Sequence, residues 1–558
     1  MQRLTTRQLN RKNDRLAASD VANRLVSCEV SYMRFTAAPQ AIERALATGQ
    51  IGVPVSVRLI AHLADDPSEI AELKKLIADK ALTWLDDAAA SVFEIENQSQ
   101  QSSQLIRTAT GRSALVSAGL CLENEPLVEV VVFGTRGVVS WEAGQSVGWA
   151  ELAKESHPTQ QANAQLQPTV DRDGGLSPPY GVLLISGDHT HQPGYAEALM
   201  AGGRCKLIGV TDEDDISDSR HQLNQRLADR LEIPLLPNLS VALARKDVDI
   251  VSVCAEPFRR GRVIVQAAQA GKHLYLDKPL AGSVEDSDAI LAAVRESGVV
   301  AHMFTQVHWD PAQRVRAIVE SGELGDLVAV HCDVCFAKGQ GGTADLSRPR
   351  IEHESPDRFE LPDAKRELTN VGVYPVAMLL WLLRQEVKRV HATTGNFFFV
   401  EHQSNDMEDF GQMMLEFDGG VTATISAGRA GWRSHPGFGL HRVCLIGTKA
   451  SMTVDAHRPR VEVWADGEPW TAPQRDPDDP MGMWAPLPDS PYRADPKNDW
   501  VLPATSSWAT DAKHFLDCIE QGRRSDVSVD VAAAASEILF AAYRSAASGA
   551  TIELPLSR

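Results

Sequence analysis

A lysine at the end of a short apolar run is the residue best placed for chemistry in this sequence. Lys278 follows the run HLYL and Asp277, and it directly precedes Pro279. Proline restricts the backbone of the residue before it, which suits a side chain held at the carboxyl end of a strand. Ligands bind at that end of a doubly wound sheet. An ammonium group placed there can polarise a substrate hydroxyl or exchange a proton with it.

A second motif pairs a tyrosine with an asparagine. The segment TNVGVYPVAMLLWLL at 369–383 is expected to open a helix, with Asn370 and Tyr374 in its first half. A tyrosine near a cationic lysine can have a lowered pKa and can exchange a proton with a substrate hydroxyl. Asn370 can hydrogen-bond a substrate but carries no charge. The alternative is that Tyr374 only packs near the start of the helix.

Alternating segments between about 180 and 304 form the framework that must position Lys278. Apolar strand-like runs alternate with helical segments, and Ser283 is expected to cap a helix that ends before Gly298. This alternation predicts an α/β Rossmann fold with a doubly wound parallel sheet. The expected strands are 181–186, 205–211, 249–254, 273–276 and 299–304, and the expected helical segments are 195–201, 220–231, 263–270 and 283–297.

The pattern changes after about residue 310. A helix-like stretch at 313–321 is followed by strands that succeed one another, with a tight turn at Gly419 and Gly420. This order predicts an α+β domain with a large open mixed or antiparallel sheet. The expected strands are 327–336, 389–394, 397–401, 410–417, 421–428 and 441–446.

The beginning of the chain resembles its end. Residues 40–57 match residues 313–330 at a constant offset of 273. Two later blocks, VSAG and FGTRG, are echoed in the same order by ISAG and IGTKA. We interpret residues 1–153 as a degenerate copy of the C-terminal α+β domain without a nucleotide domain. The alignment places Ser91 opposite Tyr374, so the copy is expected to lack the tyrosine. The alternative is that both regions merely share strand and turn composition.

Two stretches divide the chain. Residues 154–179 are rich in Gln, Pro and Gly and have the composition of a linker. Residues 467–507 hold many prolines and three tryptophans, which favours an ordered surface loop over a disordered insertion. The expected domains are therefore the N-terminal copy at 1–153, a Rossmann domain at 180–304 and a substrate-binding α+β domain at 305–558.

Composition excludes several classes of protein. The 558 residues carry a formal net charge of −19, which argues against a nucleic-acid or anionic-membrane partner. No apolar run approaches the ~18 residues of a membrane span, and the N-terminus is polar where a signal peptide would be apolar. Eight cysteines are too few for a disulfide scaffold. These features predict a cytoplasmic protein.

The motifs resemble those of the glucose–fructose oxidoreductase, inositol dehydrogenase and rhizopine catabolism (Gfo/Idh/MocA) family. The segment AGKHLYLDKPL at 270–280 is similar to the family motif AGKH…EKP, with Asp277 where Glu is usual. The resemblance implies that Lys278 is the catalytic lysine and that Tyr374 fills the family's His/Tyr position. Asn370 replaces the family's Asp and is a candidate substrate contact. The family implies a two-domain NAD(P)-dependent enzyme that acts on sugars and polyols.

The expected cofactor turn departs from the Rossmann fingerprint G-x-G-x-x-G. The strand GVLLIS runs into Gly187, Asp188 and His189, and these three residues are candidate cofactor contacts. A helix N-terminus after the turn would still favour a phosphate. Asp212 ends the second strand, where an acid can bind the ribose hydroxyls and disfavour a 2′-phosphate. The expected cofactor is therefore NAD rather than NADP, although Asp212 could instead cap a helix.

Other candidates come from positions that correspond to family motifs. The resemblance places Glu256 and Pro257 on a loop facing the cofactor, with Arg260 at the family's His position, and Asp277 is a further cofactor candidate. Exposed arginines at a helix start are the alternative. Two more residues, His308 at the domain crossover and Lys338 beyond the strand at 327–336, are candidate substrate contacts.

No metal site is expected. Cys332-x-x-Cys335 lies in a predicted strand, where positions i and i+3 point to opposite faces. His189-x-His191 has no accompanying carboxylate set, and the sequence Glu-His-Glu at 352–354 lies in a polar loop.

The sequence thus predicts an NAD-dependent oxidoreductase or epimerase for a sugar, sugar acid or cyclic polyol, with Lys278 and Tyr374 handling the proton. One alternative is a non-catalytic sugar- or nucleotide-binding protein on the same fold, because the glycine turn, Asn370 and Arg260 depart from the family. Another is an NAD-dependent lyase or glycosidase. The N-terminal copy is expected to pack on the C-terminal sheet and replace a dimer partner, and higher homo-oligomers stay open.

Overall fold

The computed structural model describes most of the chain between residues 51 and 143 and from 178 to the C-terminus. The described residues are 39, 42, 43, 45–47, 49, 51–64, 66–97, 100–121, 127–143, 178–187, 191–322, 324–337, 344–356, 366–430, 439–455, 461–463, 499–501 and 508–558. Asp188, His189, Lys338, nearly all of the predicted linker and most of the Pro/Trp-rich loop lie outside these residues.

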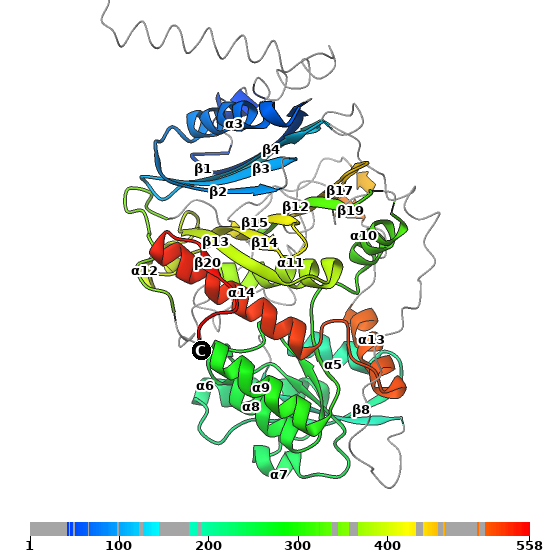
Figure 1. Ribbon diagram of the computed structural model, residues 1–558. Helices are drawn as coiled ribbons and strands as arrows, with labels where there is room; N and C mark the ends of the chain where they lie inside the picture. Colours follow the sequence, from blue (N-terminus) through cyan, green and yellow to red (C-terminus); the bar gives the residue numbers. More distant parts are fainter. Residues whose placement is uncertain are drawn as a thin grey trace, which may run out of the picture.

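Residues 180–303 form a five-stranded parallel sheet with flanking helices, seen at the bottom of Figure 1. This sheet confirms the doubly wound fold. Its strand order is β11-β10-β9-β7-β8. The Ser283 hydroxyl caps α9, which ends at Gly298 with φ of 66°, as the sequence predicts. The elements are β7 (Tyr180–Ile185), α5 (Gln192–Met200), β8 (Cys205–Thr211), α6 (Asp218–Leu231), α7 (Leu239–Leu243), β9 (Ile250–Val253), α8 (Pro257–Gln269), β10 (His273–Leu276), α9 (Val284–Ser297) and β11 (Ala301–Met303).

The C-terminal domain is built on a seven-stranded mixed sheet, as expected. Its order is β17-β16-β12-β15-β14-β13-β20, and β12 and β15 are its parallel pair. Helices α11 and α14 lie between this sheet and the Rossmann domain (Figure 1). The elements are α10 (Asp310–Ser321), β12 (Leu327–Ala337), α11 (Glu367–Leu383), β13 (Val387–Gly395), α12 (Val400–Ser404), β14 (Phe410–Phe417), β15 (Thr422–Ala430), β16 (Gly439–Gly447), β17 (Ser451–Asp455), α13 (Trp508–Gln521), α14 (Val529–Ser548) and β20 (Ile552–Glu553), while β18 (Val461–Val463) and β19 (Asp499–Val501) pair separately.

The N-terminal domain is a six-stranded sheet of order β2-β3-β4-β1-β5-β6, covered on one face by a helix. The apolar side of α3, including Leu73 and Ile77, is buried against β1, β4 and β5. The elements are β1 (Pro54–Ala64), the short helix η1 (Pro67–Glu69), α3 (Ile70–Leu85), β2 (Ala89–Asn97), β3 (Gln101–Thr108), β4 (Ser113–Leu120), β5 (Leu127–Gly134) and β6 (Gly137–Ala143).

The six strands of the N-terminal sheet correspond in order to six of the seven strands of the C-terminal sheet, and β20 has no counterpart. β1 pairs in parallel with β4, and β12 pairs in parallel with β15, while both sheets are otherwise antiparallel. The register agrees as well, because Leu59 faces Val116 as Cys332 faces Ile425.

The turns before the two first strands also match. Gly52 and Gly325 both have positive φ, of 73° and 72°. The Thr135 and Thr448 hydroxyls each accept a backbone N–H at 3.1 Å just after these glycines. We propose an internal duplication, which these matches support.

One detail of the predicted alignment is wrong. Ser91 lies in strand β2, whereas Tyr374 lies within helix α11. The helix that follows the first strand in the N-terminal sheet is α3, so the counterpart of Tyr374 falls within Ile70–Leu85. The alignment failed because it matched short motifs across loops of different length.

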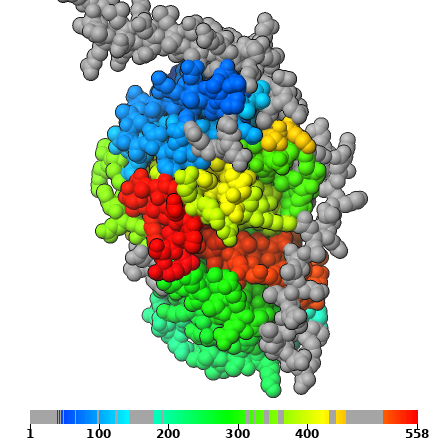
Figure 2. All heavy atoms as spheres, in the orientation of Figure 1, coloured from blue at the N-terminus to red at the C-terminus, as the bar shows by residue number. Residues whose placement is uncertain are grey.

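The two sheets pack face to face, as the sequence predicts (Figure 1), and the N-terminal domain, in blue, sits directly on the C-terminal domain in Figure 2. Val131 and Phe133 contact Phe410 and its neighbours, and Ile60 contacts Ala329 in a second apolar cluster. The layers in Figure 1 therefore run from α3 through two sheets and two helices to the Rossmann domain.

A cluster of four charged side chains spans the contact between the two sheets. The Arg58 guanidinium donates to Asp333 at 2.9 Å and to Glu129 at 2.7 Å, and Arg442 also pairs with Glu129. All four side chains are buried. These pairs fix the position of one sheet on the other, because buried charges need close partners.

No helix in the described part of the chain combines the length and the apolarity that a bilayer crossing needs.

Candidate active site

Lys278 reaches from the Rossmann domain to the first turn of helix α11. It follows β10 at the carboxyl edge of the parallel sheet. Its Nζ atom donates to the backbone oxygen and to the side-chain oxygen of Asn370, both at 2.7 Å. The lysine is 7% exposed, and burial lowers its pKa to about 8, against the pull of Asp277. The group is thus poised to gain or lose a proton near neutral pH.

A buried carboxylate orients Asn370. The Asn370 amide donates to Glu367 at 2.9 Å. Glu367 also accepts from Arg429 at 3.0 Å and faces His402 Nε2 at 3.5 Å. Burial opposes its ionisation, but Arg429 and His402 hold the pKa of Glu367 at about 2. The carboxylate therefore stays charged and keeps the Asn370 oxygen turned toward Lys278.

Tyr374 lies beside the lysine, but its pKa moves in the opposite direction to the prediction. The Lys278 ammonium lies 5.0 Å from the centre of the tyrosine ring. Burial and the charge of Asp277 raise the pKa of Tyr374 above its usual value. The prediction of a lowered pKa is wrong because burial outweighs the nearby cations. Tyr374 is thus a protonated hydroxyl near neutral pH.

Asp277 and Arg260 hold the backbone that carries Lys278. Asp277 accepts from Tyr195 at 2.7 Å, and its carboxylate lies 2.9 Å from His191 Nδ1. Arg260 donates to the backbone oxygens of Ala255, Asp277 and Pro279 and to the Asp277 carboxylate. The cationic partners hold the pKa of Asp277 far below its usual value although burial opposes this. Arg260 and Asp277 are therefore both engaged with the segment that carries Lys278, and their predicted cofactor contacts stay a prediction.

The turn after β7 fits an anionic group. A Cβ atom added to Gly187 would lie 2.6 Å from Asn224 Oδ1 and 3.1 Å from an Arg220 guanidinium nitrogen. Within the described residues neither of these buried atoms has a hydrogen-bond partner. Helix α5 begins just beyond the turn. A guanidinium and a helix N-terminus both suit a phosphate, so this end of the site fits a dinucleotide diphosphate.

The predicted ribose contact is already engaged. Asp212 Oδ1 accepts from the Arg259 guanidinium at 2.6 Å and from the Glu213 N–H, and Oδ2 accepts from Asn224 at 2.7 Å and from Arg259 at 3.3 Å. A carboxylate has about four acceptor sites. Ribose hydroxyls would therefore have to displace one of these donors.

Glu256 is the N-cap of α8 and Pro257 is its first residue, so the helix begins where a loop was expected, earlier than the predicted helix start at 263. Glu256 pairs with Arg220 at 2.6 Å and with Arg259. Burial opposes its ionisation, but the two arginines lower the pKa of Glu256 to about 2. Glu256 and Asp212 form one charged network with Arg220 and Arg259 beside the expected cofactor turn. In this network Glu256 holds both arginines in position.

His308, a predicted substrate contact, is buried against another histidine. It is 5% exposed, and its ring stacks on His514 at 3.8 Å between centroids. Asn370, by contrast, lies at the lysine. Of the predicted substrate residues that the structure describes, only Asn370 contacts Lys278; Lys338 is outside the described residues.

Several residues of the site were missed in the sequence. Glu367 could have been found, since it stands three residues before Asn370 and shares its helical turn. Arg429 directly follows the repeated ISAG block. The sequence alone did not single out Arg220 and Arg259, because carboxylates that they bind come from other loops.

Family models match the Rossmann domain and the C-terminal domain. Residues 190–305 match the oxidoreductase family with an NAD-binding Rossmann fold, and residues 312–453 match the GFO/IDH/MocA C-terminal domain. The two domains between residues 190 and 453 therefore match the two domains of the Gfo/Idh/MocA oxidoreductase family. NAD is the cofactor that the family assigns to the Rossmann domain.

Relatives of known activity are distant. The chain is 28% identical to dTDP-3,4-didehydro-2,6-dideoxy-alpha-D-glucose 3-reductase of Streptomyces violaceoruber, over 40% of this chain and 60% of the reductase. It is 23% identical to scyllo-inositol 2-dehydrogenase (NAD(+)) of Bacillus subtilis, over 56% of this chain and 79% of the dehydrogenase. The chain spans about 60% of the length of the curated relatives it matches first.

A solved structure shows the same fold. GenD2 from gentamicin A biosynthesis, in complex with NAD, superposes with a TM-score of 0.51 at 23% identity and covers 69% of this chain and 99% of its own.

Proposed function

We propose that this protein is an NAD-dependent oxidoreductase that acts on a secondary hydroxyl of a sugar, sugar acid or cyclic polyol. The observation that carries the proposal is the buried Lys278 ammonium, held at 2.7 Å by Asn370 at the carboxyl edge of the Rossmann sheet. The sugar reductase and inositol dehydrogenase among the relatives support the substrate class.

Lys278 exchanges the proton. In the oxidising direction its neutral amine takes the proton of the substrate hydroxyl while the carbinol carbon loses a hydride. NAD, when bound, supplies the hydride acceptor. In the reducing direction the ammonium returns the proton to the carbonyl oxygen. A pKa of about 8 places both protonation states within reach near neutral pH.

Tyr374 orients the reacting oxygen. Because burial keeps its hydroxyl protonated, it serves as a hydrogen-bond donor rather than as the base. Its ring also lies close to the ammonium at 5.0 Å, which favours one position of the lysine side chain. Gly187 and Arg220 would hold the cofactor diphosphate, and the negative charge of Asp212 would disfavour the 2′-phosphate of NADP without a hydrogen bond to the ribose.

A second candidate is a non-catalytic binding protein on the same fold. The saturated acceptor sites of Asp212 favour it, since they leave no free acceptor for the ribose. An NAD-dependent lyase or glycosidase would use the same lysine site and would also bind NAD.

Cofactor binding separates these candidates. Thermal shift and fluorescence of the purified chain with NADH, NAD and NADP should show stabilisation that is larger with NAD than with NADP. Gly187→Val would place carbon atoms close to Asn224 and should abolish the NAD shift, whereas Gly202→Val in an open turn should retain it. An NAD shift followed by turnover on a panel of polyols, sugar acids and glycosides supports the enzyme. No shift with either nucleotide would move the assignment to the binding protein.

A further inference from the structure

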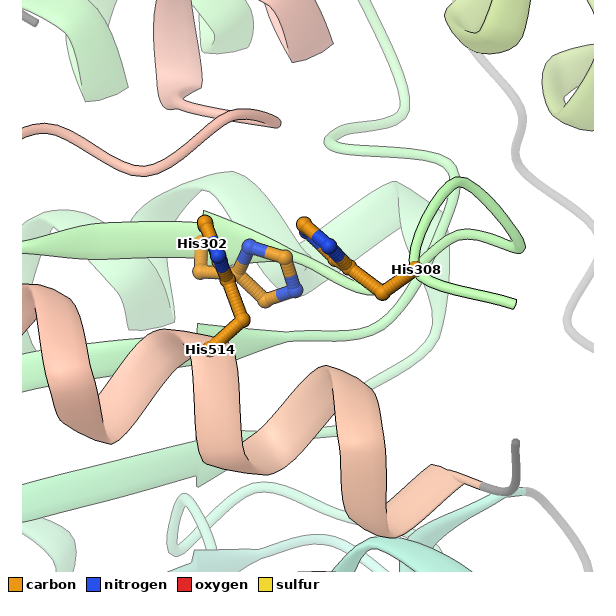
Figure 3. Close-up of side chains that lie close together, drawn as sticks. All are labelled: His302, His308 and His514. Atoms are coloured by element: carbon orange, nitrogen blue, oxygen red, sulfur yellow. The ribbon is translucent and has the colours of Figure 1, made fainter. Parts of the chain in front are cut away.

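Three histidines from three separate segments converge at the border of the Rossmann domain and helix α13 (Figure 3). His302 lies in β11, His308 in the crossover that follows, and His514 in α13. One ring nitrogen of each lies within 4.8 Å of the corresponding atoms of the other two. Histidine is the commonest protein ligand of transition metals.

One histidine is oriented by a carboxylate. His302 Nε2 lies 2.8 Å from Asp511 Oδ2, and its Nδ1 lies 2.6 Å from the Ser525 hydroxyl. The same Asp511 oxygen accepts from the Tyr275 hydroxyl at 2.7 Å. A carboxylate behind a histidine is the usual support of a metal ligand, because it fixes the ring and raises its basicity.

One histidine of the cluster and the supporting carboxylate each have an unsatisfied polar atom. Within the described residues, His308 Nε2 and Asp511 Oδ1 are buried without a hydrogen-bond partner. His308 is 5% exposed and Asp511 is fully buried. An unpartnered buried polar atom costs about 1–3 kcal/mol, so native proteins rarely keep one without a ligand, an ion or a water.

Two of the rings already have hydrogen-bond partners. The Asp526 N–H donates to His514 Nε2 at 3.2 Å, and both ring nitrogens of His302 lie within hydrogen-bond distance of Ser525 and Asp511. A neutral imidazole has a single lone pair, so an ion bound by these rings would replace a partner of each. Zinc–nitrogen bonds of about 2.0–2.1 Å place tetrahedral ligands about 3.3 Å apart, whereas the His308 and His514 rings are stacked with centroids 3.8 Å apart, so these rings would turn to bind one ion.

We propose that His302, His308 and His514 bind one divalent transition-metal ion of the zinc class, with a water molecule at the fourth tetrahedral position. The ion joins the last strand of the Rossmann sheet to α13. Tyr275 links the site to β10, two residues before Asp277, so the ion would stiffen the strand end that carries Lys278. This proposal departs from the expectation of no metal site, which rested on other cysteine, histidine and glutamate patterns in the sequence.

Metal binding by the full-length protein tests this proposal. The chain is stripped with a chelator, dialysed, incubated with Zn²⁺ or Co²⁺ and dialysed again, and bound metal is measured by mass spectrometry. We expect one equivalent per chain and, with Co²⁺, the visible absorption of a tetrahedral site. Competition with a coloured chelator gives the affinity.

Variants show whether the three histidines hold the ion. His308→Gln and His514→Gln should each weaken Zn²⁺ binding at least 100-fold and abolish the Co²⁺ absorption. His221→Gln, on an exposed position of α6, should bind as the parent does. A stripped protein that takes up no stoichiometric metal overturns the proposal, as does unchanged affinity in His308→Gln. If the variants do not fold, an octahedral Co²⁺ spectrum of the parent chain would equally overturn it. None of these readouts depends on the oxidoreductase activity.

Discussion

The ammonium of Lys278 lies 2.7 Å from both the backbone oxygen and the side-chain oxygen of Asn370. The lysine belongs to the Rossmann domain and the asparagine to the first turn of α11, so this contact ties the two domains together at the candidate active site. Glu367 and Arg429 extend the contact into the C-terminal sheet.

Removal of the lysine should abolish catalysis without unfolding the protein. Lys278→Ala is expected to lower kcat by ~10²-fold or more, the range of a lost acid–base group. Lys246→Ala, on the exposed surface, serves as the control. Steady-state kinetics and circular dichroism measure both effects. Parent-like turnover in Lys278→Ala would rule out the assigned role.

The reaction should follow the protonation of Lys278. Oxidation needs the neutral amine, so kcat/KM should rise with pH through about 8 and then level off, and reduction should show the reverse. Asn370→Asp adds a carboxylate beside the ammonium and should move the inflection upward by about one unit or more. An inflection that stays in place would mean that another group titrates.

The same pKa has a consequence for stability. The folded pKa of about 8 lies below the ordinary value of 10.5, so the unfolded chain binds more protons in this range. The lysine's contribution to the free energy of unfolding should therefore rise between pH 8 and 10.5. Urea titrations at several pH values, compared with Lys278→Met, would show it. A difference between the two proteins that does not change with pH would contradict the lowered pKa.

Tyr374→Phe separates the two roles at the site. Removing a hydrogen bond to the reacting oxygen should lower kcat/KM roughly ten- to a hundredfold. Because the tyrosine stays protonated, the pH inflection near 8 should not move. A shift of the inflection, measured over pH 6–10, would show that Tyr374 itself carries the exchanged proton.

The charged contact between the sheets should be sensitive to loss of its arginine. Arg58→Met leaves Asp333 and Glu129 buried with fewer partners, and we expect a loss of about 3–5 kcal/mol in the free energy of unfolding. Arg245→Met, which breaks an exposed pair with Asp247, should leave stability almost unchanged. Denaturant unfolding of both variants tests this, and equal losses would contradict it.

The two carboxylates at Arg58 differ in their acid response. Burial opposes the ionisation of Glu129, but Arg58 and Arg442 lower its pKa to about 2, whereas burial raises the pKa of Asp333. The stabilisation from Glu129 is present above pH 4.5 and is lost as the pH falls toward 2.

Removal of the N-terminal sheet should expose the apolar face of the C-terminal sheet. Deleting residues 1–170 is expected to give a dimer or aggregates, because Phe410, Ala329 and Met414 lose the residues that cover them. Multi-angle light scattering measures the outcome. A well-behaved monomer would refute the view that this domain takes the place of a dimer partner.

The sequence by itself determined the framework of the protein. Strand and helix alternation predicts the Rossmann sheet, because local periodicity reports which faces are buried. Ser283 and Gly298 mark the ends of α9 through local capping chemistry. The motif around Lys278 places the lysine at a strand end, and the offset between Gly52 and Gly325 revealed two corresponding sheets.

Only the tertiary structure decided the environment of the charged groups. Asp212 meets Arg259, and Tyr374 has a raised rather than a lowered pKa, since both outcomes depend on burial and on partners distant in the chain. The histidine cluster likewise joins positions 302, 308 and 514, which share no local pattern. Electrostatic energies depend on distance and solvent exposure in space, and a single sequence records neither.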